Sequence, residues 1–477
     1  MPIVKHIMPS NTEKTEEYRD KVSTIDEEGK RIWIYPKKPS GPYTRAREIL
    51  AVFLLAFLFG APFIKINNQP LLLFDVINRK FVIFGFVFWP QDFHLFVLAT
   101  LSLIVFIVLF TVIFGRLWCG WACPQTIFME MVFRKIEYWI EGDARHQIAL
   151  KKAPWTAAKL FKKILKHSIF YGISFLIGNT FLAYIIGVDE LIKIITDPPS
   201  EHLVGLTAMV IFSTVFYGVF AFFREQVCTM VCPYGRLQGV LLDQNSIVVA
   251  YDFKRGEPKG RYTRNQKREN LGDCVDCKQC VEVCPTGIDI RNGTQLECIN
   301  CTACIDACNS VMKKLNWPTG LIRYASYKGI LDGIKLRFTG RIAAYSAILF
   351  ILMVVTSVLL FGRTSVETTI LRTPGLLYQE TENGNIANLF NIKIVNKTQE
   401  QQLLELKLKS PNGLIKVLGG DIIVPEQGLF ESAFFIEIPK KNVFMARLPV
   451  YIEVYSGDEL IEEIRSSFIG PNPEKKE

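Results

Sequence analysis

The stretch Cys274-Val-Asp-Cys277-Lys-Gln-Cys280-Val-Glu-Val-Cys284-Pro285 determines what the central part of this chain folds around, and its cysteine spacing is repeated from Cys298 to Cys308. Two-residue gaps wrap a loop around one 4Fe-4S cubane so that three thiolates reach its irons, while the fourth cysteine of each run ligates the other cluster. The pattern therefore predicts two 4Fe-4S clusters in an α+β, bacterial-ferredoxin arrangement. The expected ligands are Cys274, Cys277, Cys280 and Cys308 for the first cluster, and Cys298, Cys301, Cys304 and Cys284 for the second.

Structural zinc is the simpler alternative for paired CxxC units. A zinc site needs only one pair of such units, which leaves the third and fourth cysteine of each run without a role. We also expect the hydrophobic residues of the connection between the two runs to form a compact core. These residues are Ile288, Ile290, Leu296 and Ile299.

The composition of the whole chain indicates a membrane protein. Of 477 residues, 49% are hydrophobic and 35 are Phe, which is too apolar for a soluble protein of this length. All 12 cysteines lie in short-spaced motifs, which favours metal ligation over disulfides and indicates a reducing compartment. The net charge of +9 comes from basic residues beside hydrophobic segments, so we expect membrane lipid as a partner and no nucleic acid.

Five stretches are long and apolar enough to cross a bilayer as helices. They are Ile49 to Ile64, His94 to Phe114, Ser168 to Val188, Leu203 to Phe223, and Ile342 to Phe361. The segment from Gly115 to His167 carries ten basic residues, whereas the segment from Asp189 to His202 carries one. Because basic loops stay in the cytoplasm, we expect a multi-pass protein of the bacterial inner (cytoplasmic) membrane. Its N-terminus and ferredoxin insert would be cytoplasmic and its C-terminal part periplasmic.

The last hundred residues change character again. Segments such as Phe390-Asn391-Ile392-Lys393-Ile394 alternate between apolar and polar residues, with turn residues between them. This period predicts an antiparallel, all-β immunoglobulin-like sandwich of about seven strands. The expected organisation is therefore a multi-domain membrane protein with a five-helix transmembrane bundle. The expected parts are 1–47, an N-terminal segment; 48–240, transmembrane helices 1–4; 241–341, linker and ferredoxin; 342–362, helix 5; and 363–477, the β domain.

Two further cysteine pairs resemble each other, Cys119-Gly-Trp-Ala-Cys123-Pro124 and Cys228-Thr-Met-Val-Cys232-Pro233. Each follows a predicted span, so we expect the four thiols to converge on one site. On a helix, the CxxxC spacing places both sulfurs on one face about one turn apart, where two thiolates can hold a soft ion such as Cu(I). The nearby thioethers are Met129, Met131 and Met230. A further iron-sulfur centre and simple packing of buried cysteines remain alternatives.

The combination of two CxxxCP motifs after membrane spans, a two-cluster ferredoxin insert and an outer β domain resembles the cytochrome c oxidase accessory protein family, CcoG, also called FixG or RdxA. The resemblance covers nearly the whole chain, and WCGWACPQT and VCPYGRLQG are its most specific parts. It implies a cupric reductase that assists copper delivery to, and assembly of, a cbb3-type oxidase. Carried over to this sequence, the candidate copper or redox site is Cys119, Cys123, Cys228 and Cys232.

The partners implied by this resemblance are a cytoplasmic electron donor of unknown identity, a copper exporter or chaperone, and cbb3-type oxidase subunits. The membrane half also resembles quinol-oxidising NapH-type proteins, so a quinone-linked electron conduit is an alternative, and a non-redox assembly scaffold is another. His94 is interpreted as structural or interfacial. No role is assigned to His6, His146, His167 or His202. A basic stretch could bind anionic headgroups or be a solvated linker: Lys254, Arg255, Lys259, Arg261, Arg264, Lys267 and Arg268.

Overall fold

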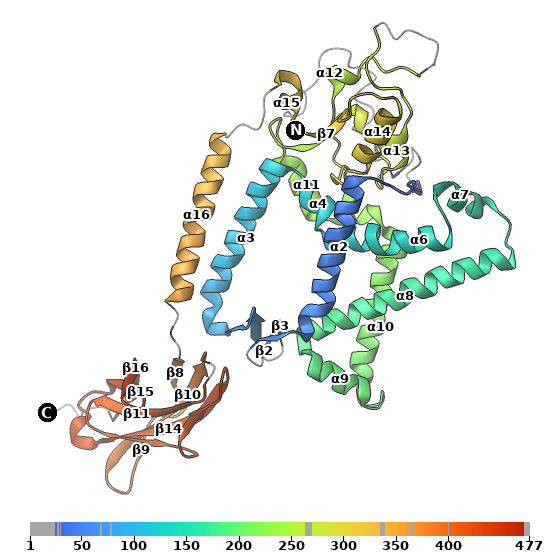
Figure 1. Ribbon diagram of the computed structural model, residues 1–477. Coiled ribbons are helices and arrows are strands. Elements are labelled where there is room, and N and C mark those ends of the chain that lie inside the picture. Colours follow the sequence, from blue (N-terminus) through green and yellow to red (C-terminus); the bar gives the residue numbers. More distant parts are fainter. Residues whose placement is uncertain are drawn as a thin grey trace. The chain divides into compact units, whose positions relative to one another are not determined.

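The computed structural model describes residues 24, 25, 28, 30–66, 69–76, 79–262, 270–333, 339–362, 364, 366–398 and 400–471. The predictions made for His6, Arg264, Lys267 and Arg268 lie outside this range. The chain forms two compact units. The first contains the ferredoxin, four long apolar helices and most of the fifth, and the second contains the end of that helix and the β domain. The two units are described separately (Figure 1).

Five helices of the described residues are long and apolar enough to cross a membrane. They are α2 (Pro42–Gly60), continued by η1 (Ala61–Phe63); α3 (Phe93–Phe114); α8 (Ala157–Ile186); α10 (Leu203–Gly218), continued by η4 (Val219–Phe223); and α16 (Gly340–Phe361). Their apolar side chains are largely exposed on the molecule, as lipid-facing residues are; Phe361 is 88% exposed. The protein is therefore a membrane protein.

Two of the helices begin earlier than their apolar stretches. α2 starts at Pro42 rather than Ile49, because proline fits the first helical turn, where its missing N–H costs nothing. α8 starts at Ala157 rather than Ser168, with Thr156 as N-cap accepting from the Lys159 amide. Its first three turns are basic, so they extend a membrane helix beyond the apolar part of the sequence.

α8 and α10 pack side by side. Their shared core is aromatic, with Phe133 stacked on Phe220 at 4.8 Å and in edge contact with Phe170 at 4.8 Å between ring centres. Two π-helical segments, η3 (Ile127–Phe133) and η4, contribute residues to this core, and a third, η5 (Val227–Val231), follows η4 in the chain. π-helical turns are rare and are frequent at functional sites, and η3 and η5 adjoin the two CxxxCP motifs.

Short elements complete the membrane half. Between α2 and α3 lie β1 (Lys65–Ile66), β2 (Gln69–Pro70), β3 (Leu72–Asp75), β4 (Lys80–Ile83), β5 (Phe86–Phe88) and η2 (Pro90–Asp92). Between α3 and α8 lie α4 (Leu117–Trp121), α5 (Pro124–Thr126), η3, α6 (Arg134–Ile140) and α7 (Ala144–Lys152). α9 (Val188–Thr196) joins α8 to α10, and α11 (Pro233–Leu241) follows η5.

The ferredoxin is small and mixed. Its elements are β6 (Val248–Tyr251), α12 (Phe253–Gly256), α13 (Gln279–Glu282), η6 (Ile290–Asn292), α14 (Ala303–Lys314), β7 (Ile322–Ala325) and α15 (Tyr327–Asp332), with β6 antiparallel to β7. Ile288, Ile290 and Ile299 are buried as expected. The expectation for Leu296 is wrong: it is 65% exposed, and its side chain lies against Gly239 of α11, so it contacts the membrane half instead of the ferredoxin core.

The second unit contains a β-sandwich. Within 366–398 and 400–471 there are nine strands rather than about seven, because two short segments, β9 and β13, also pair. They are β8 (Val366–Arg372), β9 (Gln379–Glu380), β10 (Asn385–Asn396), β11 (Gln402–Ser410), β12 (Leu414–Val417), β13 (Ile422–Val424), β14 (Leu429–Pro439), β15 (Arg447–Ser456) and β16 (Glu459–Ile469).

One sheet has the order β12-β14-β10-β8 with β9 beside β10, and the other the order β13-β11-β15-β16. All the pairings are antiparallel. Phe390, Ile392 and Ile394 point into a core that both sheets share, and Asn391 and Lys393 do not. The alternation seen in the sequence is therefore the inside–outside alternation of a two-layer sandwich.

Candidate metal and electron-transfer site

The eight ferredoxin cysteines line two cavities. One cavity is lined by Cys274, Cys277, Cys280 and Cys308, and the other by Cys284, Cys298, Cys301 and Cys304, with Cys280 also in its lining. The fourth cysteine of each run thus lies with the first three cysteines of the other run. This grouping is the one expected of a two-cluster ferredoxin.

Both loops use the same unusual backbone. Asp276 and Lys278 in the first run and Asn300 and Thr302 in the second have φ between 48° and 66°. These positions are equivalent in the two runs. Left-handed residues at every second position curl the chain tightly, which brings three cysteines of each run to one side of the loop.

The sulfur spacing fits a cluster better than a single ion. No three Sγ atoms among the twelve cysteines, all within the described residues, lie within 4.8 Å of one another. Tetrahedral zinc with Zn–S bonds of about 2.3 Å would hold its sulfurs about 3.8 Å apart. The chemistry of the donors also fits iron-sulfur clusters, which are held by thiolates. The zinc alternative is therefore not supported.

Burial keeps these thiols protonated until a metal binds. Burial raises the pKa of Cys280, Cys298 and Cys308 to about 12, and that of Cys301 to about 11. Metal ligation requires the thiolate, so loading the cavities must release protons. Cys277 is the exposed member of the first set, so the first cavity reaches the protein surface.

The membrane cysteine pairs follow a different local design from the one expected. Cys119 lies in α4 and Cys228 in η5, but Cys123 and Cys232 are extended residues that precede α5 and α11. The expectation that each pair shares one continuous helix face is therefore wrong. The reason is local: the proline that follows each second cysteine forces that cysteine out of the helical region.

The four thiols nevertheless lie near one another. Burial raises the pKa of Cys119 to about 11, and the charges of Cys123 and Cys232 add to the increase. Burial likewise raises the pKa of Cys228 to about 12, followed by the charges of Cys123, Cys119 and Cys232. The Cys119 thiol also donates to Gln238 Oε1 at 3.2 Å. One convergent group of thiols therefore forms from both CxxxCP motifs.

The ferredoxin packs directly against this group. Cys119 packs against a hydrophobic cluster of Val283, Ile299, Cys301 and Ala303, and two members of this cluster, Ile299 and Cys301, line the second cavity. The Trp121 indole donates to the Tyr324 hydroxyl at 2.9 Å, and Arg116 donates to the carbonyls of Leu296 and Gly235. The membrane thiols and the ligands of the second cluster are thus parts of one site.

The N-terminal segment ties the ferredoxin to the membrane helices. The Asp306 carboxylate accepts from the Thr44 amide and hydroxyl, both at 2.7 Å, at the start of α2. The Lys37 amide donates to the Glu282 carbonyl at 2.8 Å, and the Tyr138 hydroxyl donates to the Pro36 carbonyl at 2.9 Å. The start of α2 therefore contacts α14 (Figure 1).

The candidate methionines differ in burial, and two of the histidines have polar partners outside the cysteine motifs. Met129 is buried in the aromatic core of α8 and α10, and Met230 is exposed. His94 is exposed in the first turn of α3. His167 Nδ1 lies 2.8 Å from the Tyr217 hydroxyl, and His202 Nε2 lies 3.0 Å from Asp197 Oδ2.

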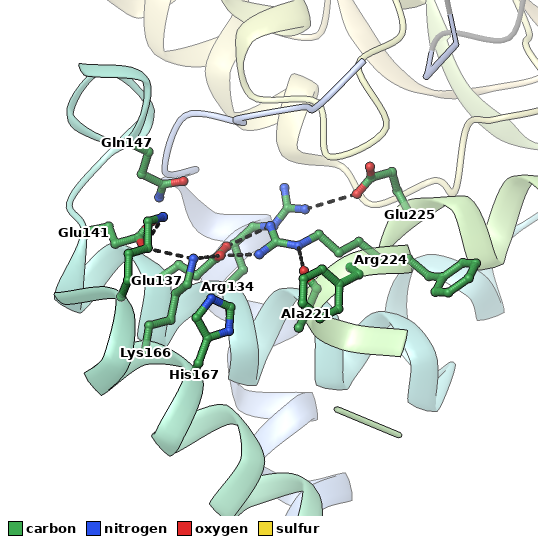
Figure 2. A network of polar contacts seen from close by, with 12 residues as sticks. Arg134, Glu137, Glu141, Gln147, Lys166, His167, Ala221, Arg224 and Glu225 are labelled. Atoms are coloured by element: carbon green, nitrogen blue, oxygen red, sulfur yellow. Dashed lines mark hydrogen bonds and ion pairs between the residues drawn. The ribbon is translucent and has the colours of Figure 1, made fainter. Parts of the chain in front are cut away.

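A buried charge network was not expected from the sequence (Figure 2). Glu137 accepts from both Arg224 Nη atoms and lies 3.3 Å from Lys166 Nζ, which also pairs with Glu141 at 2.9 Å. Burial opposes ionisation of Glu137, yet these cations hold its pKa down at about 2. No sequence motif predicts the network. The only signal in the sequence is the presence of charged residues next to apolar runs at the ends of the predicted spans.

Arg134 joins this network to the thiols. It is buried, pairs with Glu130 at 3.3 Å, and lies 3.9 Å from Glu225. Glu130 is close enough to Cys228 and Cys301 for its charge to act on both thiols. Arg224 and Glu225 lie four and three residues before Cys228, so the network holds the backbone that leads into the second CxxxCP motif.

The fold and the site together define a membrane iron-sulfur protein of the electron-transfer class. Family models agree with this assignment. A 4Fe-4S dicluster domain matches residues 223–327, a 4Fe-4S binding domain matches 96–143, and the IG-like fold at the C-terminus of FixG matches 356–471.

Curated relatives extend the match to most of the chain. The nitrogen fixation protein FixG of Rhizobium meliloti is 33% identical over 92% of this chain and 91% of its own. Proteins RdxA and RdxB of Cereibacter sphaeroides are 34% and 32% identical over 80% and 82% of this chain and 84% and 85% of their own. The chain belongs to the FixG/RdxA family, and redox activity in general follows from that membership.

Proposed function

We propose that this chain is a cupric reductase, which reduces Cu(II) to Cu(I) at the thiols of Cys119, Cys123, Cys228 and Cys232. The observation that carries the proposal is the packing of Cys119 against the hydrophobic cluster that contains Cys301, an expected ligand of the second cluster. When bound there, 4Fe-4S clusters supply electrons one at a time, which is what the reduction of copper requires.

In this proposal the four thiols bind the product, Cu(I), more tightly than Cu(II). Thiolates are soft ligands and favour Cu(I) over Cu(II). Because no three of the four sulfurs lie within 4.8 Å of one another, a copper ion would be held by two thiolates at a time. Cys119 and Cys228, which are protonated when free, would each release a proton as copper binds.

The proposal includes the setting of the reaction. The family relationship and the basic loops support a bacterial inner membrane location, with the N-terminus and ferredoxin in the cytoplasm and the β domain in the periplasm. The product would go to the assembly of a cbb3-type cytochrome c oxidase. The partners would be an as yet unidentified cytoplasmic electron donor, a copper exporter or chaperone, and oxidase subunits.

The test is anaerobic reduction of Cu(II) by the purified, dithionite-reduced protein, followed with a Cu(I)-specific chelator. A Cys119→Ala, Cys228→Ala variant with unchanged iron content is the matched control. Loss of chelatable Cu(I) in the variant supports the proposal. Equal rates in both proteins refute copper reduction at these thiols.

A second candidate is an electron conduit, quinone-linked or not, in which the four membrane thiols hold a further iron-sulfur centre. Two observations favour it. The 4Fe-4S binding domain match at 96–143 contains Cys119 and Cys123 as its cysteines, and no three of the membrane sulfurs lie within 4.8 Å of one another, which is also true of the cluster ligands. Iron content above that of two clusters, lost in the same double variant, would establish this candidate.

A further inference from the structure

Two buried arginines lie where the ferredoxin meets the membrane thiols. Arg47 of α2 is 4% exposed, and its Nε donates to the Gly120 carbonyl at 2.9 Å. Gly120 follows Cys119 directly, and its Cα lies so close to the loop of the second cluster that an added Cβ would be 2.5 Å from the Ile299 carbonyl oxygen. The Arg47 charge also acts on the Cys301 thiol.

Arg116 occupies the other side of the same contact. It is 5% exposed and donates to the carbonyls of Leu296, in the ferredoxin, and Gly235, in α11. Its charge acts both on Cys119 and on Cys298. A single guanidinium therefore faces a membrane thiol and a ligand of the second cluster.

Neither arginine is neutralised by a carboxylate. Within the part of the chain that the structure describes, no ion pair includes Arg47 or Arg116, and the Nε of Arg116 has no hydrogen-bond partner. Both guanidinium groups bond to neutral backbone carbonyls instead. Their positive charges consequently remain uncompensated in a poorly solvated site, where charge interactions are strong.

The first cluster has the opposite arrangement. Arg291, whose charge acts on Cys280, is paired with Asp289 at 2.7 Å and with Asp276 at 2.5 Å. Arg255, whose charge acts on Cys308, is paired with Asp273. Three carboxylates thus surround two arginines there.

Two carboxylates are also present on the side of the second cluster. Glu130 is paired with Arg134, and Asp306 accepts three hydrogen bonds from Tyr43 and Thr44. Counting Arg47, Arg116 and Arg134 against these two leaves one positive charge in excess. At the first cluster Lys278 also lines the cavity, so Arg255, Arg291 and Lys278 balance the three aspartates and leave no positive charge in excess.

We propose that Arg47 and Arg116 raise the reduction potential of the cluster held by Cys284, Cys298, Cys301 and Cys304, so that the electron is held on the side next to Cys119. A cluster gains one negative charge when it accepts an electron, and net charge nearby is one determinant of its potential. The electron comes from the reductant that loads the ferredoxin. The proposal concerns the cluster alone and holds whether or not copper is the substrate.

The test is a mediated potentiometric titration of the full-length, copper-free protein, followed by EPR. Arg116→Gln and Arg47→Gln should each lower one and the same midpoint potential and leave the other unchanged. Arg116→Lys keeps the positive charge, so its midpoint potentials should match those of the wild type. Arg45→Gln, a change on the opposite, exposed face of α2 that removes equal charge, should shift neither midpoint.

Asp276→Asn identifies which of the two midpoint potentials belongs to the first cluster. The variant removes a carboxylate beside Arg291 and should raise the midpoint potential of the first cluster only. The proposal is overturned if both glutamine variants, with iron content intact, keep the midpoints of the wild type, or if they lower both midpoints equally. Should one glutamine variant lose its clusters, the other arginine and the lysine variant still decide the question.

Discussion

Gly120 is the position where the docking of the ferredoxin on Cys119 can be tested most sharply. A Cβ at this position would lie 2.5 Å from the Ile299 carbonyl oxygen and 2.7 Å from that of Asn300. Ordinary contact begins at 3.4 Å, so the ferredoxin loop would have to move by 3.4 minus 2.5, about 0.9 Å. The obstacles are backbone atoms and cannot rotate away. Overpacking of this kind costs about 1–3 kcal/mol.

Gly120→Ala should therefore weaken the contact between the ferredoxin and the membrane half. We expect earlier loss of cluster absorbance in thermal unfolding and slower Cu(II) reduction, with unchanged iron content at low temperature. Gly172→Ala is the matched control, because it lies in α8 with no atom within 4 Å of the added Cβ. If Gly120→Ala unfolds and reduces copper as Gly172→Ala does, the close docking of the two parts is refuted.

Three further results are expected. Cys308→Ser should remove the cluster of the first cysteine run and spare that of the second, as seen by iron analysis and EPR, because Cys308 lines the cavity of Cys274 and Cys277; loss of the second cluster alone would contradict this grouping. Glu137→Gln should cost about 3–5 kcal/mol by leaving Arg224 buried and unpaired, measured by thermal unfolding. Because the folded pKa of Glu137 is about 2, the stabilisation by its carboxylate is complete above an ordinary carboxyl pKa of about 4.3 and is lost as the pH falls from there towards 2. The variant should therefore lose less stability than the wild type over this pH range. If stability depends on pH in the same way in both proteins, Glu137 does not contribute to the acid dependence. An iron chelator should remove the cluster from the cavity with the exposed Cys277 before it removes the other cluster, as monitored by EPR. Loss of both clusters at the same rate would show that exposure does not control the release of iron.

Local sequence patterns were sufficient for several elements. The cysteine runs predicted the two-cluster fold because a cubane fixes the spacing of its own ligands. Length and hydropathy identified the five membrane helices, and the alternation around Phe390 identified a sandwich strand. Each of these signals lies within a short stretch of chain, where geometry relates residue spacing to structure directly.

Other features required the tertiary structure. The CxxxC pairs were expected on helix faces, but each following proline breaks the helix, and the thiols of different motifs come together instead. Leu296 was assigned to the ferredoxin core because it is apolar, yet it contacts α11. A hydrophobic residue is compatible with any apolar neighbour, so its partner depends on which elements pack together.

The sequence by itself determined the classes of this protein: a membrane chain, a two-cluster ferredoxin with eight cysteines, a β-sandwich and two CxxxCP cysteine pairs. The tertiary structure alone decided that Cys119 lies beside the second cluster's ligands, that Arg47 and Arg116 stand unpaired between them, and that Glu137, Lys166 and Arg224 form one buried network. The physical reason is the distance along the chain over which each kind of interaction acts. Spacing rules act over a few residues, whereas charges and packing act between segments that are far apart in the chain.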